Sequence, residues 1–229
     1  MKKLAAITVM IFLFSGSLAA QRVLEKTFKP EQDAKILMKF DFADSIRIET
    51  WKKNEVYVKV IVSINDNKDN EAFQLEFDDH GWYVEIESKI NELDKLAKKN
   101  QRIVRQDGQR ITTRGHSVDL DLAFWVYLPE GQTLEAETIS GDILMEGYPG
   151  EMKLKTISGF IDLSLPETYG ADVKMSTISG GMYSNFDFDA NGPDGLRSFG
   201  KRSMTSSLNS GGTSLKLETI SGDIFLRKR

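Results

Sequence analysis

The chain has 229 residues, 40% of them hydrophobic, and carries a formal net charge of −4 at pH 7. It contains no cysteine, which excludes disulfide bonds, thiol chemistry and the acylated cysteine of a lipoprotein. The acidic balance argues against nucleic acid as a partner. Beyond the N-terminus, no segment is apolar enough to predict a membrane-spanning helix.

Residues 1–20 have the organisation of a secretory signal peptide. A basic start is followed by eleven uncharged residues, from Leu4 to Phe14, and then by small residues. This run is shorter than the ~20 residues that span a bilayer, which disfavours an uncleaved anchor. We expect cleavage after Ala19 or Ala20 and a location in the periplasm or at the cell surface. The mature chain would keep 28 basic and 34 acidic residues, a net charge of −6.

The N-terminal β-rich region is predicted to cover residues 21–117. Between residues 35 and 88, apolar and polar residues alternate with the period of half-buried strands. Val56 to Ile64 place five β-branched residues on one face, and charged residues fill the other face. The pattern predicts an antiparallel sheet with one solvent-facing side. Turn residues at 65–67 and 78–81 separate its strands.

Residues 89–117 interrupt this pattern with a basic insertion. Apolar residues at helical spacing predict one short helix near 89–100, and Asp107-Gly108 predicts a tight turn in a hairpin-like arm. Two interpretations of the basic residues stay open, a patch for a polyanion and a solvated loop. The candidate patch consists of Lys95, Lys98, Lys99, Arg102, Arg105, Arg110 and Arg114.

A second region, residues 118–229, opens with the clearest strand of the sequence. Apolar residues occupy alternate positions from Val118 to Leu128. Trp125 and Tyr127 make the end of this strand apolar on both sides, which predicts that both of its faces are covered there.

Four copies of Thr-Ile-Ser-Gly follow, separated by 18, 21 and 42 residues. Such a period predicts a stacked repeat. Apolar residues before each motif share the parity of its Thr, whereas those after it share the parity of its Ile. A corner is therefore expected between Thr and Ile, with both side chains facing the core. The structural repeat residues are Thr138, Ile139, Ser140, Gly141, Thr156, Ile157, Ser158, Gly159, Thr177, Ile178, Ser179, Gly180, Thr219, Ile220, Ser221 and Gly222.

The repeats predict an all-β fold in which each copy forms a strand, a corner, a second strand and a turn. Stacked copies would align like residues in columns, as in a β-solenoid or β-roll. A two-sheet β-sandwich has the same pattern and remains an alternative. Residues 185–210 predict a long exposed loop with a degenerate rung, and Lys228-Arg229 are expected to place charge on an edge strand.

Candidate catalytic residues are sparse. The repeated serines need a base, and the two histidines, His80 and His116, fall in a predicted turn and in the basic insertion. Asp142 and Asp223 follow two copies of the motif, and paired carboxylates would suit a carbohydrate-active enzyme on a β-helix. Four equivalent copies favour a structural column over one active centre, so the sequence predicts a protein that is not an enzyme.

A possible metal site lies between the third and fourth repeats. Asp187, Asp189 and Asn191, followed by Gly192, match the opening half of a calcium loop. The twelfth position of such a loop should be Glu and is Ser198. The sequence therefore predicts at best a weak calcium site and no other cofactor.

The strand at 118–128, the four repeats and the ending at 209–226 together resemble the bacterial putative adhesin family, exported domains of unknown function with a repeated Ser-Gly-Asp-Ile pattern. The resemblance implies an exported, non-catalytic protein and transfers no binding residue. We expect an envelope interaction or scaffold module that binds an unknown polymer or protein partner through its repeat surface. The alternatives are the carbohydrate-active enzyme and a weak calcium-dependent adhesive module.

Overall fold

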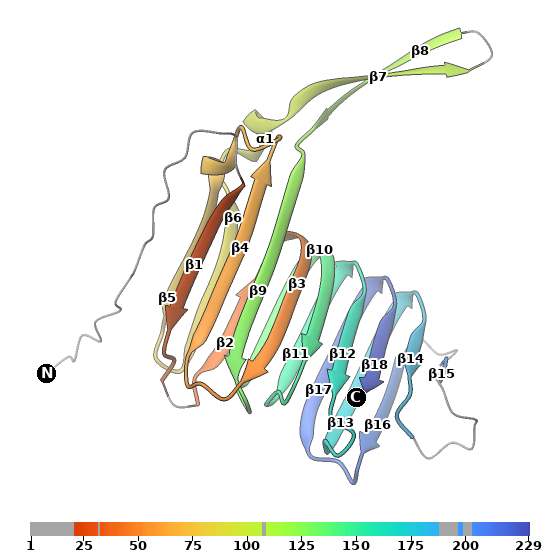
Figure 1. The fold of residues 1–229 in the computed structure, drawn as a ribbon. Helices are drawn as coiled ribbons and strands as arrows, with labels where there is room; N and C mark the ends of the chain where they lie inside the picture. Colours follow the sequence, from red (N-terminus) through yellow and green to blue (C-terminus); the bar gives the residue numbers. More distant parts are fainter. Residues whose placement is uncertain (1–20, 32, 107–108, 188–196, 199–202) are drawn as a thin grey trace, which may run out of the picture.

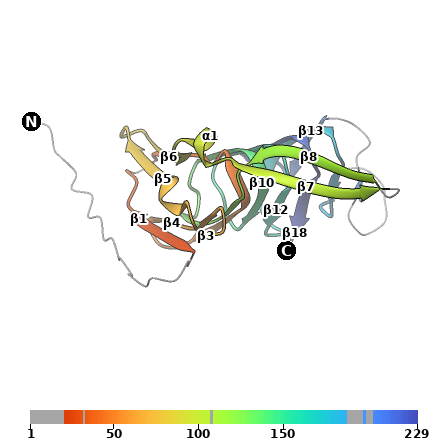
Figure 2. The same ribbon diagram turned by 90° about the horizontal axis from the view of Figure 1, so that it is seen from above.

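The computed structural model describes residues 21–31, 33–106, 109–187, 197–198 and 203–229, with the backbone alone for 98–117 and 197–198. Nearly all of its regular structure is β-strand. Apart from one hairpin, the described strands belong to a single open sheet that bends back into two layers (Figures 1 and 2). The prediction of an all-β, solenoid-like fold is confirmed.

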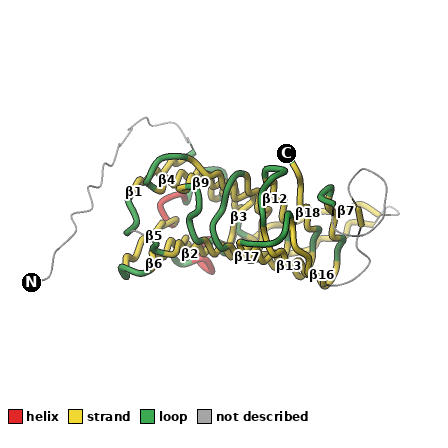
Figure 3. Tube along the Cα trace, turned by 90° about the horizontal axis from the view of Figure 1, so that it is seen from below, coloured by secondary structure: helices red, strands yellow, loops and turns green. Residues whose placement is uncertain are grey.

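The first layer holds the strands that precede the corner of each repeat (Figure 3). Its strands, in spatial order, are β5 (Phe73–Asp79), β6 (Tyr83–Ile90), β2 (Lys35–Lys39), the first half of β10 (Leu134–Glu146), β11 (Met152–Ser158), β17 (Thr213–Ser221), β13 (Ala171–Ser179) and β16 (Ser203–Leu208). Neighbours from β6 to β13 are parallel, whereas β5 and β16 pair antiparallel at the two ends.

The second layer holds the strands that follow each corner. Its order is β1 (Arg22–Phe28), β4 (Val56–Ile64), β9 (Leu120–Pro129), β3 (Phe42–Trp51), the second half of β10, β12 (Ile161–Leu165), β18 (Ile224–Lys228), β14 (Met182–Ser184) and β15 (Arg197–Ser198). Neighbours from β9 to β14 are parallel. The antiparallel pairing predicted for the N-terminal region holds for its outer strands, while β2 and β3 run parallel to the repeats.

Two short helices and a hairpin complete the chain. They are the 3₁₀-helix η1 (Asn70–Ala72), the single-turn helix α1 (Leu93–Leu96), and the paired strands β7 (Lys98–Gln106) and β8 (Gln109–Ser117). The helix predicted near 89–100 is confirmed. Strands β7 and β8 form a sheet of their own that projects from the body (Figure 1), and the predicted turn at Asp107-Gly108 lies outside the described residues.

The core fills the space between the layers as one continuous apolar cluster. The five β-branched residues from Val56 to Ile64 are fully buried, as their alternation predicts. Phe40 stacks on Phe124 with ring centroids 4.2 Å apart, and Phe73 contacts the same ring at 6.3 Å. Because residues far apart in sequence meet in this cluster, the N-terminal strands and the repeats share one core.

The four repeats do not stack in the order of the chain. The last copy, on β17 and β18, lies between the second copy, on β11 and β12, and the third copy, on β13 and β14. After β14, the chain returns as β16 antiparallel to β13, and a turn at 209–212 leads it into the gap. Lys228 therefore ends an interior strand, so the prediction that Lys228-Arg229 charge an edge strand is wrong.

Candidate functional site

The four motifs lie above one another at a single corner between the layers. Their threonines are in register in the order Thr138, Thr156, Thr219 and Thr177, and each is at most 5% exposed. The Oγ1 of Thr156 donates a hydrogen bond to the carbonyl oxygen of Gly141 at 3.2 Å, and Thr219 and Thr177 repeat this bond one rung further on. The threonine column therefore ties each rung to the next.

The glycine of each motif allows neighbouring rungs to approach closely. Gly159 has a φ of +148°, and a Cβ at this position would lie 2.1 Å from the carbonyl oxygen of Gly141. Equivalent contacts occur at the other three motif glycines. Since an L side chain would clash with backbone atoms, the corner requires glycine.

The isoleucines of the motif face solvent, so their predicted inward orientation is wrong. Their exposed fractions are 42% for Ile139, 39% for Ile157, 61% for Ile178 and 43% for Ile220. The inward face does change parity, because Thr138 and Ile143 are both buried. The change is completed at the glycine, so the residues between Thr and Gly occupy the outside of the bend. The result is an exposed isoleucine column along the edge of the stack.

The motif serines form a column beside the isoleucines. Ser158, Ser179 and Ser221 are exposed. His80 lies at the opposite end of the first-layer strands, where its ring stacks on that of Tyr83 at 4.4 Å. The side chain of His116 lies outside the described residues. The structure thus gives no support to a serine nucleophile with a histidine base.

The two aspartates that follow the motif contribute to the stack. The Oδ1 of Asp142 accepts a hydrogen bond from the backbone N–H of Phe160 at 3.1 Å, and that of Asp223 accepts one from Gly181 at 2.7 Å. In each pair, the carboxylate bridges two adjacent rungs. These contacts account for both acids without a catalytic role.

The candidate calcium residues are for the most part outside the described chain. Asp187 is exposed, whereas Asp189 and Asn191 fall in the undescribed segment. Within the described residues, no group of three or more His, Asp or Glu side chains is arranged to hold a metal ion. Calcium binding stays a prediction.

The basic residues of the insertion are brought together on the projecting hairpin and the helix before it. Lys95, in α1, forms an exposed ion pair with Glu92 at 2.5 Å. Backbone pairing places Arg105 opposite Arg110 at the far end of the hairpin. The remaining patch residues, Lys98, Lys99, Arg102 and Arg114, lie along β7 and β8.

The outer face of the first layer is covered by ion pairs between rungs. Glu135 binds the Nζ atoms of Lys35 and Lys153, each at 2.5 Å, and thereby joins three adjacent strands. Burial raises the pKa of Glu135, but the hydrogen bonds and positive charges of Lys153 and Lys35 outweigh this effect and lower the pKa to about 2. This face therefore presents charges that are largely paired.

The outer face of the second layer carries an aromatic cluster that the sequence analysis did not identify. Its members, which are half-buried, are Trp51, Tyr57 and Tyr127. Trp125 lies beside them on β9, and the Nζ of Lys59 is 5.9 Å from the centroid of its ring. The ring of Trp51 stacks on that of Tyr127 at 5.2 Å, and Tyr57 lies 6.0 Å from Tyr127. In the sequence, the one indication of this cluster was the end of the strand at 118–128, where Trp125 and Tyr127 make both sides apolar. The outer face expected to be covered there stays partly exposed to solvent.

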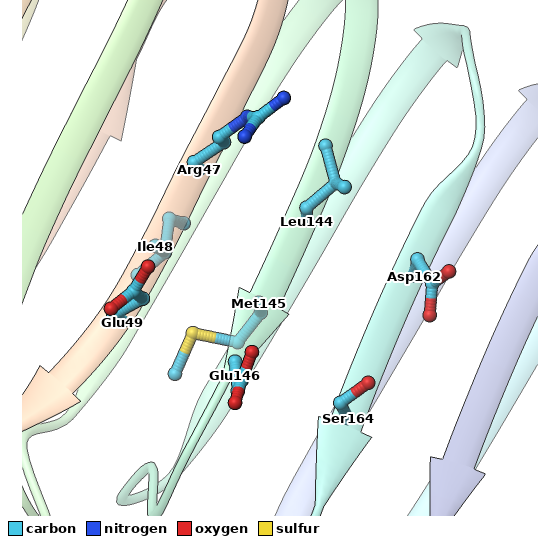
Figure 4. A pocket seen from close by; sticks show the side chains of 8 residues that line it. All are labelled: Arg47, Ile48, Glu49, Leu144, Met145, Glu146, Asp162 and Ser164. Carbon is cyan, nitrogen blue, oxygen red and sulfur yellow. The ribbon is translucent and has the colours of Figure 1, made fainter.

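A shallow depression lies beside this cluster, across β3, β10 and β12. Figure 4 shows the side chains of the residues that line it, which are Arg47, Ile48, Glu49, Leu144, Met145, Glu146, Asp162 and Ser164. The guanidinium of Arg227 contacts both carboxylate oxygens of Asp162 at 2.8 Å, and Arg229 pairs with Glu146. The depression thus combines paired acids with an exposed arginine and an exposed glutamate.

Comparison with known proteins gives a family match for the repeat region alone. Residues 126–227 match the family model described as Toastrack DUF4097. The repeat region is similar to Toastrack domains. This match confirms the predicted resemblance to a bacterial putative adhesin family, although the shared Ser-Gly-Asp-Ile detail stays a prediction. No curated protein matches the chain.

One solved structure supports the same fold. A putative cell adhesion protein from Clostridium sporogenes has a TM-score of 0.56 at 13% identity, over 91% of this chain and all of the other. A putative adhesin from Parabacteroides merdae, at 10% identity, covers 71% of this chain and 60% of its own, with a TM-score of 0.31. A putative lipid binding protein from Parabacteroides distasonis, also at 10% identity, covers 71% and 70%, with a TM-score of 0.30. The first comparison shows the fold, and the other two are too distant to extend it.

The Toastrack match begins inside β9 and thus divides the aromatic cluster. Tyr127 lies within the matched segment, whereas Trp51, Tyr57 and Trp125 precede it. The surface built by these four residues therefore combines the repeat region with the N-terminal strands. In the described part of the chain, no helix has the length and apolarity needed to cross a membrane.

Proposed function

We propose that this protein is an exported, non-enzymatic module of the bacterial envelope that binds a polymer or protein partner through the outer faces of its stacked strands. The observation that supports this proposal is the register. Parallel neighbours keep like positions opposite one another from the N-terminal strands to the repeats, so outward side chains form rows across the whole stack. Such rows favour extended contact over a single deep pocket.

The internal use of the motif residues points to the same surfaces. Three of the four threonine hydroxyls, the motif glycines and the Oδ1 atoms of Asp142 and Asp223 are used in contacts between rungs. These contacts favour binding by outward residues elsewhere on the strands. The match of residues 126–227 to the Toastrack model and the similarity to a putative cell adhesion protein support a binding module.

A retention experiment tests the proposal. The mature chain, residues 21–229, is immobilised and exposed to separated cell-wall and membrane fractions, beside a variant lacking the hairpin 98–117. We expect retention of one fraction by both proteins. Retention lost with the hairpin would assign binding to the basic patch. Retention by neither, or release of reducing ends from the retained material, would contradict the proposal.

The export step has its own test. We expect the protein isolated from bacteria to begin at Ala20 or Gln21, as measured by intact mass and N-terminal sequencing. A protein that retains residues 1–20 in the cytoplasm would contradict the proposed location.

A further inference from the structure

One row of outward side chains crosses six strands of the second layer. Register places Trp125 of β9 opposite Arg47 of β3, and continues through Leu144 and Asp162 to Phe225 and Tyr183. With strands ~4.8 Å apart, the distance from Trp125 to Phe225 is about 19 Å. The row is therefore long enough to contact several units of a linear polymer.

Both ends of the row are aromatic. The first end is Trp125 itself, next to the cluster of Trp51, Tyr57 and Tyr127 and with the Nζ of Lys59 5.9 Å from its ring centroid. At the second end, the rings of Tyr183 and Phe225 stack at 5.3 Å with an interplanar angle of 16°, and Phe160 contacts Phe225 at 6.2 Å. All of these rings are half-buried, so each still offers part of its surface to solvent. The guanidinium of Arg227 lies over the ring of Phe225, 4.9 Å from its centroid, and covers part of that ring. Such side chains give apolar contact at low entropic cost.

The middle of the row is the polar depression of Figure 4. Arg47 and Glu49 are both exposed, and neither forms an ion pair with any residue in the described part of the chain. Asp162 and Glu146 are paired with arginines. The depression consequently offers hydrogen-bond donors and acceptors with balanced charge, which disfavours a polyanion or a polycation as its ligand.

We propose that this row is the binding site for a neutral, hydroxyl-rich polysaccharide that lies across the strands. Pyranose rings have an apolar C–H face, which packs on aromatic rings, and a rim of hydroxyls. Those hydroxyls would bind Arg47, Glu49 and Ser164 in the depression. The inference rests on the proposed function, because it names the partner of one outer face. A lipid is disfavoured by the charged groups between the two aromatic ends.

The three tryptophans of the chain make a direct test available. Trp51 belongs to the aromatic cluster and Trp125 to the row beside it, whereas Trp82 is 73% exposed on the turn before β6. The mature protein is titrated with cellohexaose, chitohexaose and a β-1,3-glucan hexamer, by calorimetry and by fluorescence of a Trp82→Phe variant. We expect at least one hexamer to bind with a change in the fluorescence of the two remaining tryptophans.

Variants locate the site. Trp125→Ala and Arg47→Ala should each weaken binding by about tenfold or more, and the matched control Trp82→Ala should leave it unchanged. Circular dichroism and thermal melts verify that each variant is folded, and Arg47→Lys is substituted if Arg47→Ala fails to fold. The proposal is overturned if no hexamer binds at millimolar concentration, or if Trp125→Ala and Arg47→Ala bind as well as the wild type.

The outcome is separable from that of the proposed function. If wild-type protein retains envelope material and Trp125→Ala retains as much, the glycan site fails while the binding module stands. If protease treatment of the envelope fraction abolishes retention and periodate oxidation does not, the partner is a protein and the glycan inference is overturned. If nothing is retained, the proposed function fails.

Discussion

The N-terminal rung and the repeat rungs turn the same corner with different residues. In the repeats, Gly141 adopts a φ of +128°, and Asp142 follows it directly. In the rung formed by β2 and β3, Ala43 takes the place of the glycine. The pairing skips one residue there, because Ser45 lies opposite Asp142. Ala43 is not among the described residues with positive φ. An extra residue can therefore replace a glycine with positive φ. The Thr-Ile-Ser-Gly motif is required at the corners that lack this extra residue.

Gly159→Ala should cause the largest loss of stability. Its Cβ would lie 2.1 Å from a backbone oxygen, at a φ that L residues rarely adopt. We expect about 3 kcal/mol or more of destabilisation in urea unfolding. Gly131→Ala is the control, because Gly131 also has a positive φ but nothing within 4 Å of an added Cβ. It should lose about 1 kcal/mol. Equal losses for the two variants would contradict the close approach of the rungs.

The ion pairs of Glu135 should make stability depend on pH. Because its folded pKa, about 2, is below its ordinary value of 4.5, this carboxylate stabilises the protein above pH 4.5, and the contribution is lost as the pH falls toward 2. After allowance for solvent screening, we expect about 1 kcal/mol. Glu135→Gln should show a smaller decrease in unfolding free energy between pH 4.5 and pH 2.5. Parallel curves for variant and wild type would refute this assignment.

Ala43→Gly tests whether the corner between β2 and β3 needs a glycine. If the extra residue makes the N-terminal corner, glycine brings no benefit there and adds backbone freedom to the unfolded chain. We expect a loss of about 0.7 kcal/mol, which is the usual cost of replacing alanine by glycine. A gain of stability on thermal unfolding would mean that this corner is strained in the same way as the others.

Ile157→Asp should have the smallest effect. Its side chain lies on the outside of the bend and is 39% exposed, so we expect a change of roughly 0.5 kcal/mol or less. Leu154→Asp, two positions before the motif and fully buried, is the matched control and should unfold the repeats. A large loss of unfolding free energy in Ile157→Asp would indicate that the isoleucine column packs in the core.

Local periodicity was enough to predict most of the strands, the short helix and the existence of a corner at each repeat, but not the strand β1 at Arg22–Phe28. It did not place the corner correctly. The change of parity shows that a bend lies between Thr138 and Ile143, but it does not show which of the residues in between face solvent. Long-range order was also beyond it. Nothing in the spacing of the motifs indicates that Thr219 stacks between Thr156 and Thr177, since that order depends on the path of β16.

The candidate binding surface could not be predicted from the sequence for the same reason, because it depends on long-range pairing of strands. Trp51, Tyr57 and Tyr127 come from three strands, and their contact depends on the register of β3, β4 and β9. A single strand shows a doubly apolar end at Trp125 but not the neighbours that complete the surface. Motif residues such as Ser158 were candidates for function because they repeat. Their repetition instead follows from the stacking of equivalent corners.

The interior position of β17 and β18 has a consequence for how the molecule is assembled. As the chain emerges from its N-terminus, β13 and β14 have no parallel neighbour until the final residues, 213–228, become available. Completion of the stack must therefore wait for residues 213–228, and such long-range pairings are of the kind that slow folding. A nonsense mutation or a protease that removes residues 213–228 would separate the rung of β13 and β14 from the other rungs. In a solenoid whose repeats stack in chain order, loss of the last repeat would only shorten the stack.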